Sequence, residues 1–139
     1  MMNDESSLSL TKADIAEMKD LDRRLTEAMS RKDLDAVMEC FWNDPDLVIM
    51  LNGTVYRGPD ETRAAIKALF DQNESISLKV NEITHVPSGD AVIGVGTATY
   101  DLKPLGGQRK LLVERWSDLR RKIDGHWVYV LDHTTHLPD

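Results

Sequence analysis

Apolar residues recur at three- and four-residue steps in the first third of the chain, a spacing typical of amphipathic helices. Thr11 with Asp14, and Asp33 further on, are suited to cap two such helices. The first predicted helix buries Ile15, Met18, Leu21, Leu25, Ala28 and Met29, and the second buries Leu34, Val37, Met38 and Phe41. The pattern therefore predicts a long helix followed by a short one.

A short hairpin and a third helix are predicted next. Residues 47–51 form an apolar run, Asn52-Gly53 is a turn dipeptide, and 54–57 can form the second strand. Gly58-Pro59 then opens a helix, because proline suits the first helical position and acidic residues follow it in the first turn.

After residue 73 the apolar positions alternate with a period of two, which indicates strands. We predict four long strands, over residues 74–86, 91–103, 110–123 and 126–136, with a β-bulge at Asn81-Glu82 where the alternation breaks. Asp124-Gly125 between the last two runs is a strong hairpin signal.

On the 91–103 strand, the small residues Gly94, Gly96 and Ala98 lie on one face and leave room for a close neighbour. Helices first and strands last predict an α+β fold with the sheet wrapped over the helices.

Length and composition narrow the class of protein. The 139 residues suit one domain, with 1–10 expected as a disordered tail and 11–139 as the domain. A net charge of −7 without a basic block argues against a nucleic-acid interface. The absence of a long apolar run or a signal-like N-terminus predicts a soluble, cytoplasmic protein that does not enter membranes. The single cysteine, Cys40, excludes an intrachain disulfide, and the histidine spacing does not suggest a metal site.

Two segments resemble a known family. They are Tyr56-Arg-Gly-Pro-Asp-Glu-Thr-Arg-Ala-Ala-Ile66 and Asp124-Gly-His-Trp-Val-Tyr-Val-Leu-Asp-His-Thr-Thr135, at the opening of the third helix and in the closing strand. With the order of elements over residues 11–137, they resemble the NTF2-like fold and its SnoaL-like branch. The resemblance implies a cone of three helices and a curved antiparallel or mixed sheet around a ligand pocket, and a homodimer. The family includes isomerases, cyclases, epoxide hydrolases and dehydratases, so the resemblance implies no single reaction.

The chain departs from two catalytic patterns that the resemblance would imply. Ketosteroid-isomerase members carry an aspartate base in the first strand, where this chain has the apolar residues 49–51. Epoxide-hydrolase members use an arginine between two aspartates. Asp132 matches one of these aspartates, but no Arg-x-Asp accompanies it; Arg115 and Tyr100-Asp101 are the available substitutes.

The closing hairpin carries the candidate catalytic residues. With an unbulged two-residue turn, Trp116 faces His133 and Ser117 faces Asp132. Asp132 then shares the pocket-facing side with Arg115, while Trp116, Trp127, Tyr129 and Leu131 form an outer patch suited to a homodimer. A slip of one residue would exchange the two faces. Asp132 is the first candidate for proton transfer and His133 the second; for each, a structural role is the alternative. His85 and His136 are expected at the surface.

The predicted pocket binds a small hydrophobic molecule without a cofactor. Its candidate ligand-binding residues are Tyr56, Arg115, Trp42, Met38, Met50, Phe70 and Tyr100, each of which is also suited to simple core packing. Tyr56 would donate a hydrogen bond, and Arg115 would orient the acid or bind an anionic group. The predicted chemistry is acid–base isomerisation, cyclisation or hydrolysis. The alternative is a non-catalytic ligand-binding or dimerisation domain.

Overall fold

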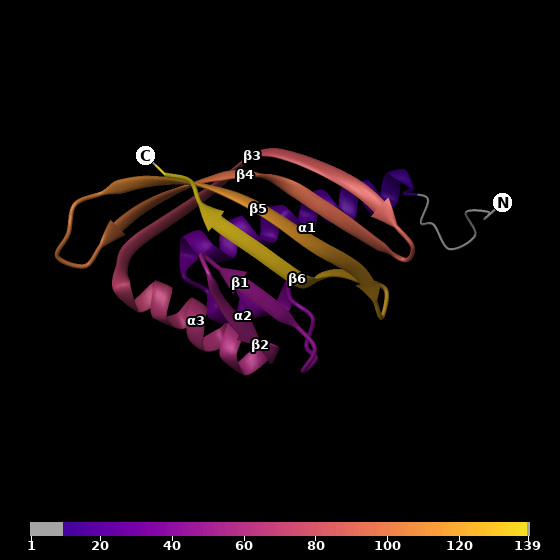
Figure 1. Ribbon diagram of the computed structural model, residues 1–139, viewed down its shortest axis with the longest axis horizontal. Coiled ribbons are helices and arrows are strands. Elements are labelled where there is room, and N and C mark those ends of the chain that lie inside the picture. The colour runs from indigo at the N-terminus through magenta and orange to yellow at the C-terminus, as the bar shows by residue number, and fades with distance from the viewer. Residues whose placement is uncertain (1–9, 139) are drawn as a thin grey trace.

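The computed structural model describes residues 10–138, so all of the predicted disordered tail except Leu10 lies outside the described residues. Three helices and six strands follow one another in the predicted order (Figure 1). The elements are α1 (Lys12–Arg31), α2 (Leu34–Glu39), β1 (Val48–Leu51), β2 (Thr54–Arg57), α3 (Gly58–Gln72), β3 (Asn73–Ser88), β4 (Ala91–Pro104), β5 (Lys110–Ile123) and β6 (His126–His136). The predicted α+β class is confirmed.

The helix ends have the capping contacts that the sequence predicts. The backbone N–H of Asp14 donates to the Thr11 hydroxyl at 3.0 Å, and the backbone N–H of Thr11 donates to the Asp14 carboxylate at 3.2 Å, which completes a capping box. The Asp33 carboxylate accepts from the N–H of Ala36 at the start of α2. In α3, proline occupies the first turn together with Asp60 and Glu61.

The six strands form one mixed sheet in the order β2-β1-β6-β5-β4-β3. All neighbouring strands are antiparallel except β1 and β6, which pair in parallel. The long strands arch over α1, while α2 and α3 lie below the arch (Figure 1). The register shift between Val80 and Glu82 is the predicted bulge of β3. The result is the predicted cone, with a concave inner face that looks toward the helices.

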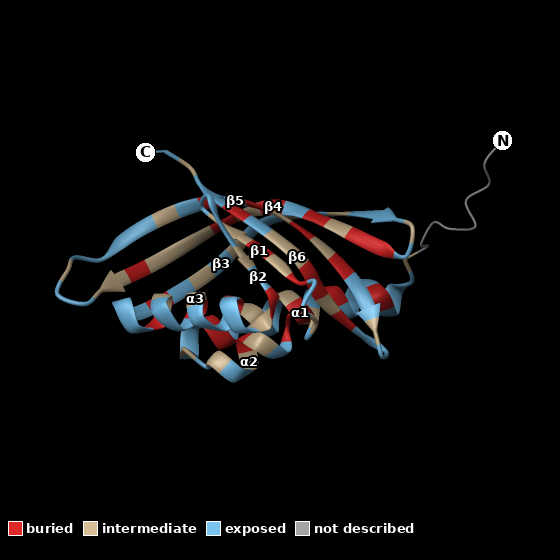
Figure 2. Cartoon of the chain, turned by 60° about the horizontal axis from the view of Figure 1, so that its bottom comes forward, coloured by how far each residue is buried: buried red, intermediate tan, exposed pale blue. Residues whose placement is uncertain are grey.

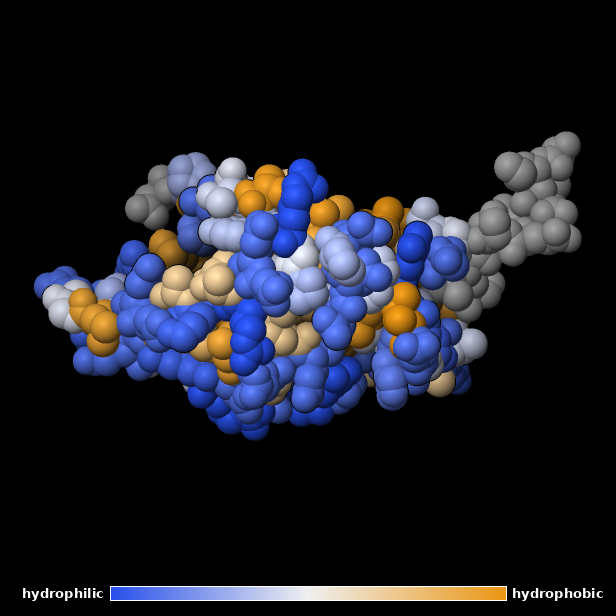
Figure 3. All heavy atoms as spheres, turned by 90° about the horizontal axis from the view of Figure 1, so that it is seen from below, coloured by the Kyte–Doolittle hydropathy of each residue, from blue (hydrophilic) through white to orange (hydrophobic). Residues whose placement is uncertain are grey.

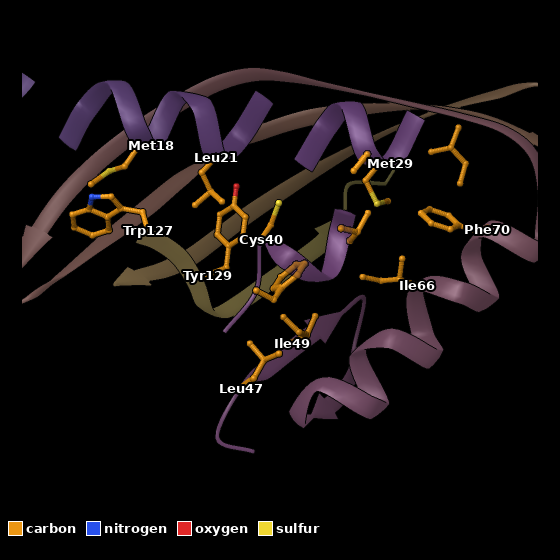
Figure 4. Close-up of a cluster of buried hydrophobic side chains, with 14 of the residues drawn as sticks. Met18, Leu21, Met29, Cys40, Leu47, Ile49, Ile66, Phe70, Trp127 and Tyr129 are labelled. Atoms are coloured by element: carbon orange, nitrogen blue, oxygen red, sulfur yellow. The ribbon is translucent and has the colours of Figure 1, made fainter. Parts of the chain in front are cut away.

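The hydrophobic core lies between the sheet and the helices. Buried positions recur along α1 and along β4, β5 and β6, where they alternate with more exposed ones (Figure 2). Met18 of α1 lies against Trp127 of β6, and Leu21 lies near Tyr129 (Figure 4). Cys40 is fully buried in the same cluster, where burial raises the pKa of its thiol to about 11. From below, the surface is mostly hydrophilic, with separate hydrophobic patches (Figure 3).

The closing hairpin has the predicted turn and a different register. Asp124 and Gly125 both have positive φ angles, 51° and 82°, as a two-residue turn of this hand requires. Near the turn Ile123 pairs with His126 as expected, but Val130 is an extra residue on β6, because Arg120 pairs with Tyr129 and Leu119 with Leu131. Beyond this bulge the predicted register is wrong by one residue. Asp132 pairs with Asp118, and Trp116 pairs with Thr134.

No helix within residues 10–138 is long and apolar enough to cross a membrane.

Candidate functional site

A cavity of about 90 Å³ lies between the inner face of the sheet and the three helices. Most of its wall is apolar, with Leu25, Met29, Phe41, Ile49, Ile66, Leu69 and Leu78 among the lining residues. This volume exceeds the space that one water needs and is below that of a drug-sized ligand pocket. It therefore suits a small molecule or one end of a larger one.

Three carboxyl groups of the sheet face this cavity. Glu114 and Asp118 come from β5 and Asp132 from β6. Asp118 and Asp132 are direct cross-strand partners, so their Cβ atoms are about 5 Å apart. No group of three potential metal ligands is arranged to hold an ion in the part of the chain that the structure describes. The cluster is thus a set of close carboxyl groups in largely apolar surroundings.

Burial raises the pKa of each of these carboxyls, because a charge in apolar surroundings is poorly solvated. The pKa of Glu114 rises to about 7 through burial. Burial raises the pKa of Asp118 to about 6 although Arg120 opposes the shift. For Asp132, burial and then the neighbouring Asp118 and Glu114 carboxylates raise the pKa well above its ordinary value. The site therefore holds both proton donors and proton acceptors near neutral pH.

Arg120 lies behind these carboxyls and is completely buried. Its Nε donates to Asp118 Oδ1 at 2.9 Å, and its Nη1 donates to Asp22 Oδ2 of α1 at 3.1 Å. The Tyr129 hydroxyl donates to Asp22 Oδ1 at 2.5 Å, and the guanidinium carbon lies 5.0 Å from the Tyr129 ring centroid. This network joins α1 to the sheet. It also places an arginine between two aspartates, at positions other than those that the resemblance indicated.

Glycines of β4 provide the space for this network. A Cβ on Gly94 would lie 2.6 Å from Asp118 Oδ1 and 2.9 Å from Arg120 Nη2. A Cβ on Gly96 would meet the Trp116 ring at 2.6 Å. The small face predicted on this strand therefore accommodates the ion pair and the indole of β5.

Two predicted site residues lie at the cavity. Asp132 lines it from β6, and Tyr100 lines it from β4. Burial, followed by the charges of Glu114 and Asp132, raises the pKa of the Tyr100 phenol well above its ordinary value, so this hydroxyl remains a hydrogen-bond donor. Catalysis by Asp132 stays a prediction.

Two other candidate residues point away from the cavity, and for Arg115 the bulge is the reason. Arg115 and His133 are exposed on the outer face of the sheet, because they alternate with the inward-facing Glu114, Trp116 and Asp132. His133 has its Nε2 3.3 Å from the Thr135 hydroxyl. Placing Arg115 beside Asp132 was therefore wrong, and His133 does not reach the cavity.

The remaining predicted ligand-binding residues do not line the cavity. Phe70 and Tyr56 pack in or against the hydrophobic core. Met38 and Trp42 line a separate surface hollow beside α3. Met50 pairs with the outward-facing His133, while its neighbour Ile49 faces the cavity. These five residues are not among those that line the cavity, and a role for them in ligand binding stays a prediction.

The predicted outer aromatic patch does not exist. Trp116, Trp127 and Tyr129 are buried on the inner face, and only Leu131 lies outside. The Trp127 Nε1–H donates to Asp14 Oδ1 of α1 at 3.3 Å. The extra residue Val130 explains the error, because it brings Tyr129 and Asp132, three positions apart, to the same face.

Sequence reasoning missed Glu114, Asp118, Arg120 and Asp22. The alternating positions of Glu114, Asp118 and Arg120 on one strand would have placed them on one face, but charged residues normally indicate a solvent-facing side. His85 was expected at the surface and is half-buried instead. Its Nε2 is buried without a hydrogen-bond partner among the described residues, and burial, then Arg120, lowers its pKa.

Replacing Glu114 by glutamine should stabilise the protein at high pH. The pKa of Glu114 rises from 4.5 to about 7 on folding, so the native state binds this proton more tightly. The resulting stabilisation is complete below pH 4.5 and is lost as the pH rises through about 7. At pH 8 we expect Glu114→Gln to raise the free energy of unfolding by about 1–3 kcal/mol.

Urea unfolding of wild type and variant at pH 8 and pH 5 measures this difference. The gain should shrink at pH 5, where wild-type Glu114 is protonated in the native state. Glu82→Gln, at an exposed position of β3, is the control and should change little at either pH. An equal gain for Glu114→Gln at both pH values would contradict the raised pKa.

The comparisons with known proteins agree with this architecture. The family model described as a SnoaL-like domain matches residues 23–130. An NTF2-like protein of unknown function from Shewanella oneidensis is 31% identical, with a TM-score of 0.67, covering 87% of this chain and 98% of its own. A proposed dehydratase of the NTF2-like family from Streptomyces avermitilis has a TM-score of 0.77 at 16% identity, covering 91% and 98%. A hexachlorocyclohexane dehydrochlorinase has a TM-score of 0.75 at 18% identity, covering 91% and 86%. No curated protein matches the sequence significantly.

Proposed function

Because the chain belongs to the SnoaL-like domain family, we propose that it binds a small, mostly apolar organic molecule in the cone and transforms it by proton transfer. One observation carries this proposal. Asp132 lines an apolar cavity directly across from Asp118, and burial and the neighbouring carboxylates raise its pKa well above the ordinary range. A carboxyl held in its neutral form is a proton donor at neutral pH.

The other polar groups of the cavity support acid–base chemistry. Glu114, with a pKa of about 7, can accept or return a proton near neutral pH. Arg120 holds Asp118 in place from behind, so Asp118 supports Asp132 rather than moving with the ligand. Tyr100 supplies a neutral hydroxyl on the same wall. The proposed roles are Asp132 as acid, Glu114 as base and Tyr100 as hydrogen-bond donor.

Elimination or isomerisation is the reaction class that fits these roles. Both reactions need one group to take a proton from carbon and another to give a proton elsewhere or assist a leaving group. Two of the structural neighbours are named for eliminations, a dehydratase and a dehydrochlorinase. They share the fold at less than 20% identity, so their reactions serve here only to choose the first compounds for testing.

Asp132→Asn tests the proposal. Small apolar alcohols, alkyl halides and enolisable ketones are screened for turnover by NMR, and the best substrate is then offered to the variant. We expect kcat to fall by about 10²–10⁴-fold, because the amide cannot donate an acidic proton. Thermal stability should be unchanged or higher, because a buried carboxyl with a raised pKa does not stabilise the fold at neutral pH.

Asp90→Asn is the matched control, since Asp90 is exposed in the β3–β4 turn. Its turnover should equal that of the wild type. If Asp132→Asn unfolds the protein, Asp132 is structural; if kcat is unchanged, Asp132 is not the acid. Either result overturns its proposed role.

A second candidate function is association with another copy of the chain through the outer face of the sheet. Exposed apolar residues lie there on neighbouring strands, with Val95 on β4 and Leu111 and Val113 on β5. They replace the buried aromatic residues as the candidate contact surface. Sedimentation analysis measures the association, and a monomer at all concentrations would remove this candidate.

A further inference from the structure

The charges around the cavity are unbalanced. Its lining includes four carboxyl side chains and no lysine, arginine or histidine; the four are Asp22, Glu114, Asp118 and Asp132. Arg120, which does not line the cavity, forms ion pairs with two of them, at 3.1 Å to Asp22 and 2.9 Å to Asp118. Asp132 makes no ion pair within residues 10–138. Asp132 is held neutral by burial, which leaves Glu114 as the carboxylate that faces the cavity without an ion pair at hydrogen-bond distance.

Glu114 has unused hydrogen-bonding capacity inside the protein. It is only 4% exposed, it lines the cavity, and no described residue donates a hydrogen bond to its side chain. The imidazole Nε2 of the exposed His136 lies 3.8 Å from Oε2, beyond hydrogen-bond distance. A buried carboxyl without donors is costly unless a partner supplies them. The cavity side of Glu114 is the direction from which such a partner can come.

Aromatic rings lie beside this carboxyl. Trp116 is two positions from Glu114 on β5. Tyr100 lies on the neighbouring strand β4, where it pairs with Leu112, two positions from Glu114 on the other side. Aromatic faces attract cations, and this attraction is stronger away from water. Carboxyls and aromatic rings on an apolar wall are together the surroundings that a protonated amine prefers.

We propose that the ligand of this cavity is a small aliphatic amine, whose protonated nitrogen donates to the Glu114 carboxylate. The inference rests on the proposed binding function and names the class of ligand for the same site. The apolar wall formed by residues such as Leu25, Ile49 and Leu78 receives the alkyl group. A cavity of about 90 Å³ limits that group to a few carbon atoms.

Three probes of similar shape test the proposal: isobutylamine, isobutanol and isobutyrate. Each is titrated into ¹⁵N-labelled protein at pH 7.5, and the amide shifts of β4, β5 and β6 report binding in the cavity. We expect isobutylamine to bind about tenfold or more tightly than isobutanol, since hydrogen bonds to charged groups are the stronger ones. Isobutyrate should not bind.

Glu114→Gln should abolish the preference for the amine over the alcohol, because the amide carries no charge. Glu82→Gln, on the exposed part of β3, should keep the wild-type preference. Equal binding of isobutanol and isobutylamine to the wild type would overturn this inference and leave the binding function intact. Binding of none of the three probes would overturn the inference and count against the binding function as well.

Discussion

Replacing Arg120 by methionine should lower the free energy of unfolding by about 3–5 kcal/mol, because breaking a buried ion pair leaves uncompensated charge in the interior. Arg120 is completely buried and contacts both Asp118 and Asp22. Without it, two carboxyls face each other across the junction of α1 and the sheet. The Tyr129 ring also loses its cationic neighbour, whose guanidinium carbon lies 5.0 Å from the ring centroid.

Arg121→Met is the matched control, because Arg121 is adjacent in sequence and exposed. Its nearest carboxylate, Asp90, is 3.5 Å away and is itself exposed. We expect this change to cost less than about 1 kcal/mol. Urea denaturation of both variants gives the comparison, and equal losses for the two arginines would contradict the buried network.

Adding a single methyl group at Gly96 should also be severely destabilising. Gly96 pairs with Trp116 across β4 and β5. An alanine Cβ would lie 2.6 Å from the Trp116 ring and would overlap the backbone carbonyl oxygen of Glu82, which cannot move without disturbing the bulge of β3. Overpacking of this kind costs about 1–3 kcal/mol and occasionally more.

Thermal denaturation of Gly96→Ala measures this cost, and the intrinsic fluorescence should change as Trp116 shifts toward the cavity. Gly107→Ala in the β4–β5 connection is the control. Its added Cβ would meet only the Pro104 ring, at 3.2 Å, and no backbone atom, so the loss of stability should be less than about 1 kcal/mol. If the two glycines respond alike, the close packing at Gly96 is not present.

Local signals in the sequence were sufficient for the elements and their order. The Thr11–Asp14 capping box, the Gly58-Pro59 helix start and the Asp124-Gly125 turn each involve residues close together in the chain. Such features are determined by backbone geometry and side chains within a few positions. The α+β fold therefore followed from the sequence with little error.

The faces of the last two strands depend on contacts that the sequence does not show locally. Val130 bulges out of a regular apolar run, without a glycine or proline to mark it. A charged residue such as Arg120 normally indicates a solvent-facing position, yet Arg120 is buried because Asp22, 98 positions away, meets it across the core. Asp132 faces the cavity as expected, but the bulge gives it Asp118 as its cross-strand partner in place of Ser117. A site built from distant charges needs the fold before it can be recognised.

The most direct test of the carboxyl site is a ¹³C NMR titration of the side-chain carboxyl carbons of wild-type protein. We predict that Glu114 titrates at about pH 7 rather than 4.5, and that Asp132 stays protonated well above its ordinary value of 3.8. Those results would show that burial keeps both carboxyls at least partly protonated at neutral pH. Titration of both groups near pH 4 would contradict the account, because the carboxyls would then be solvated and would have no raised pKa.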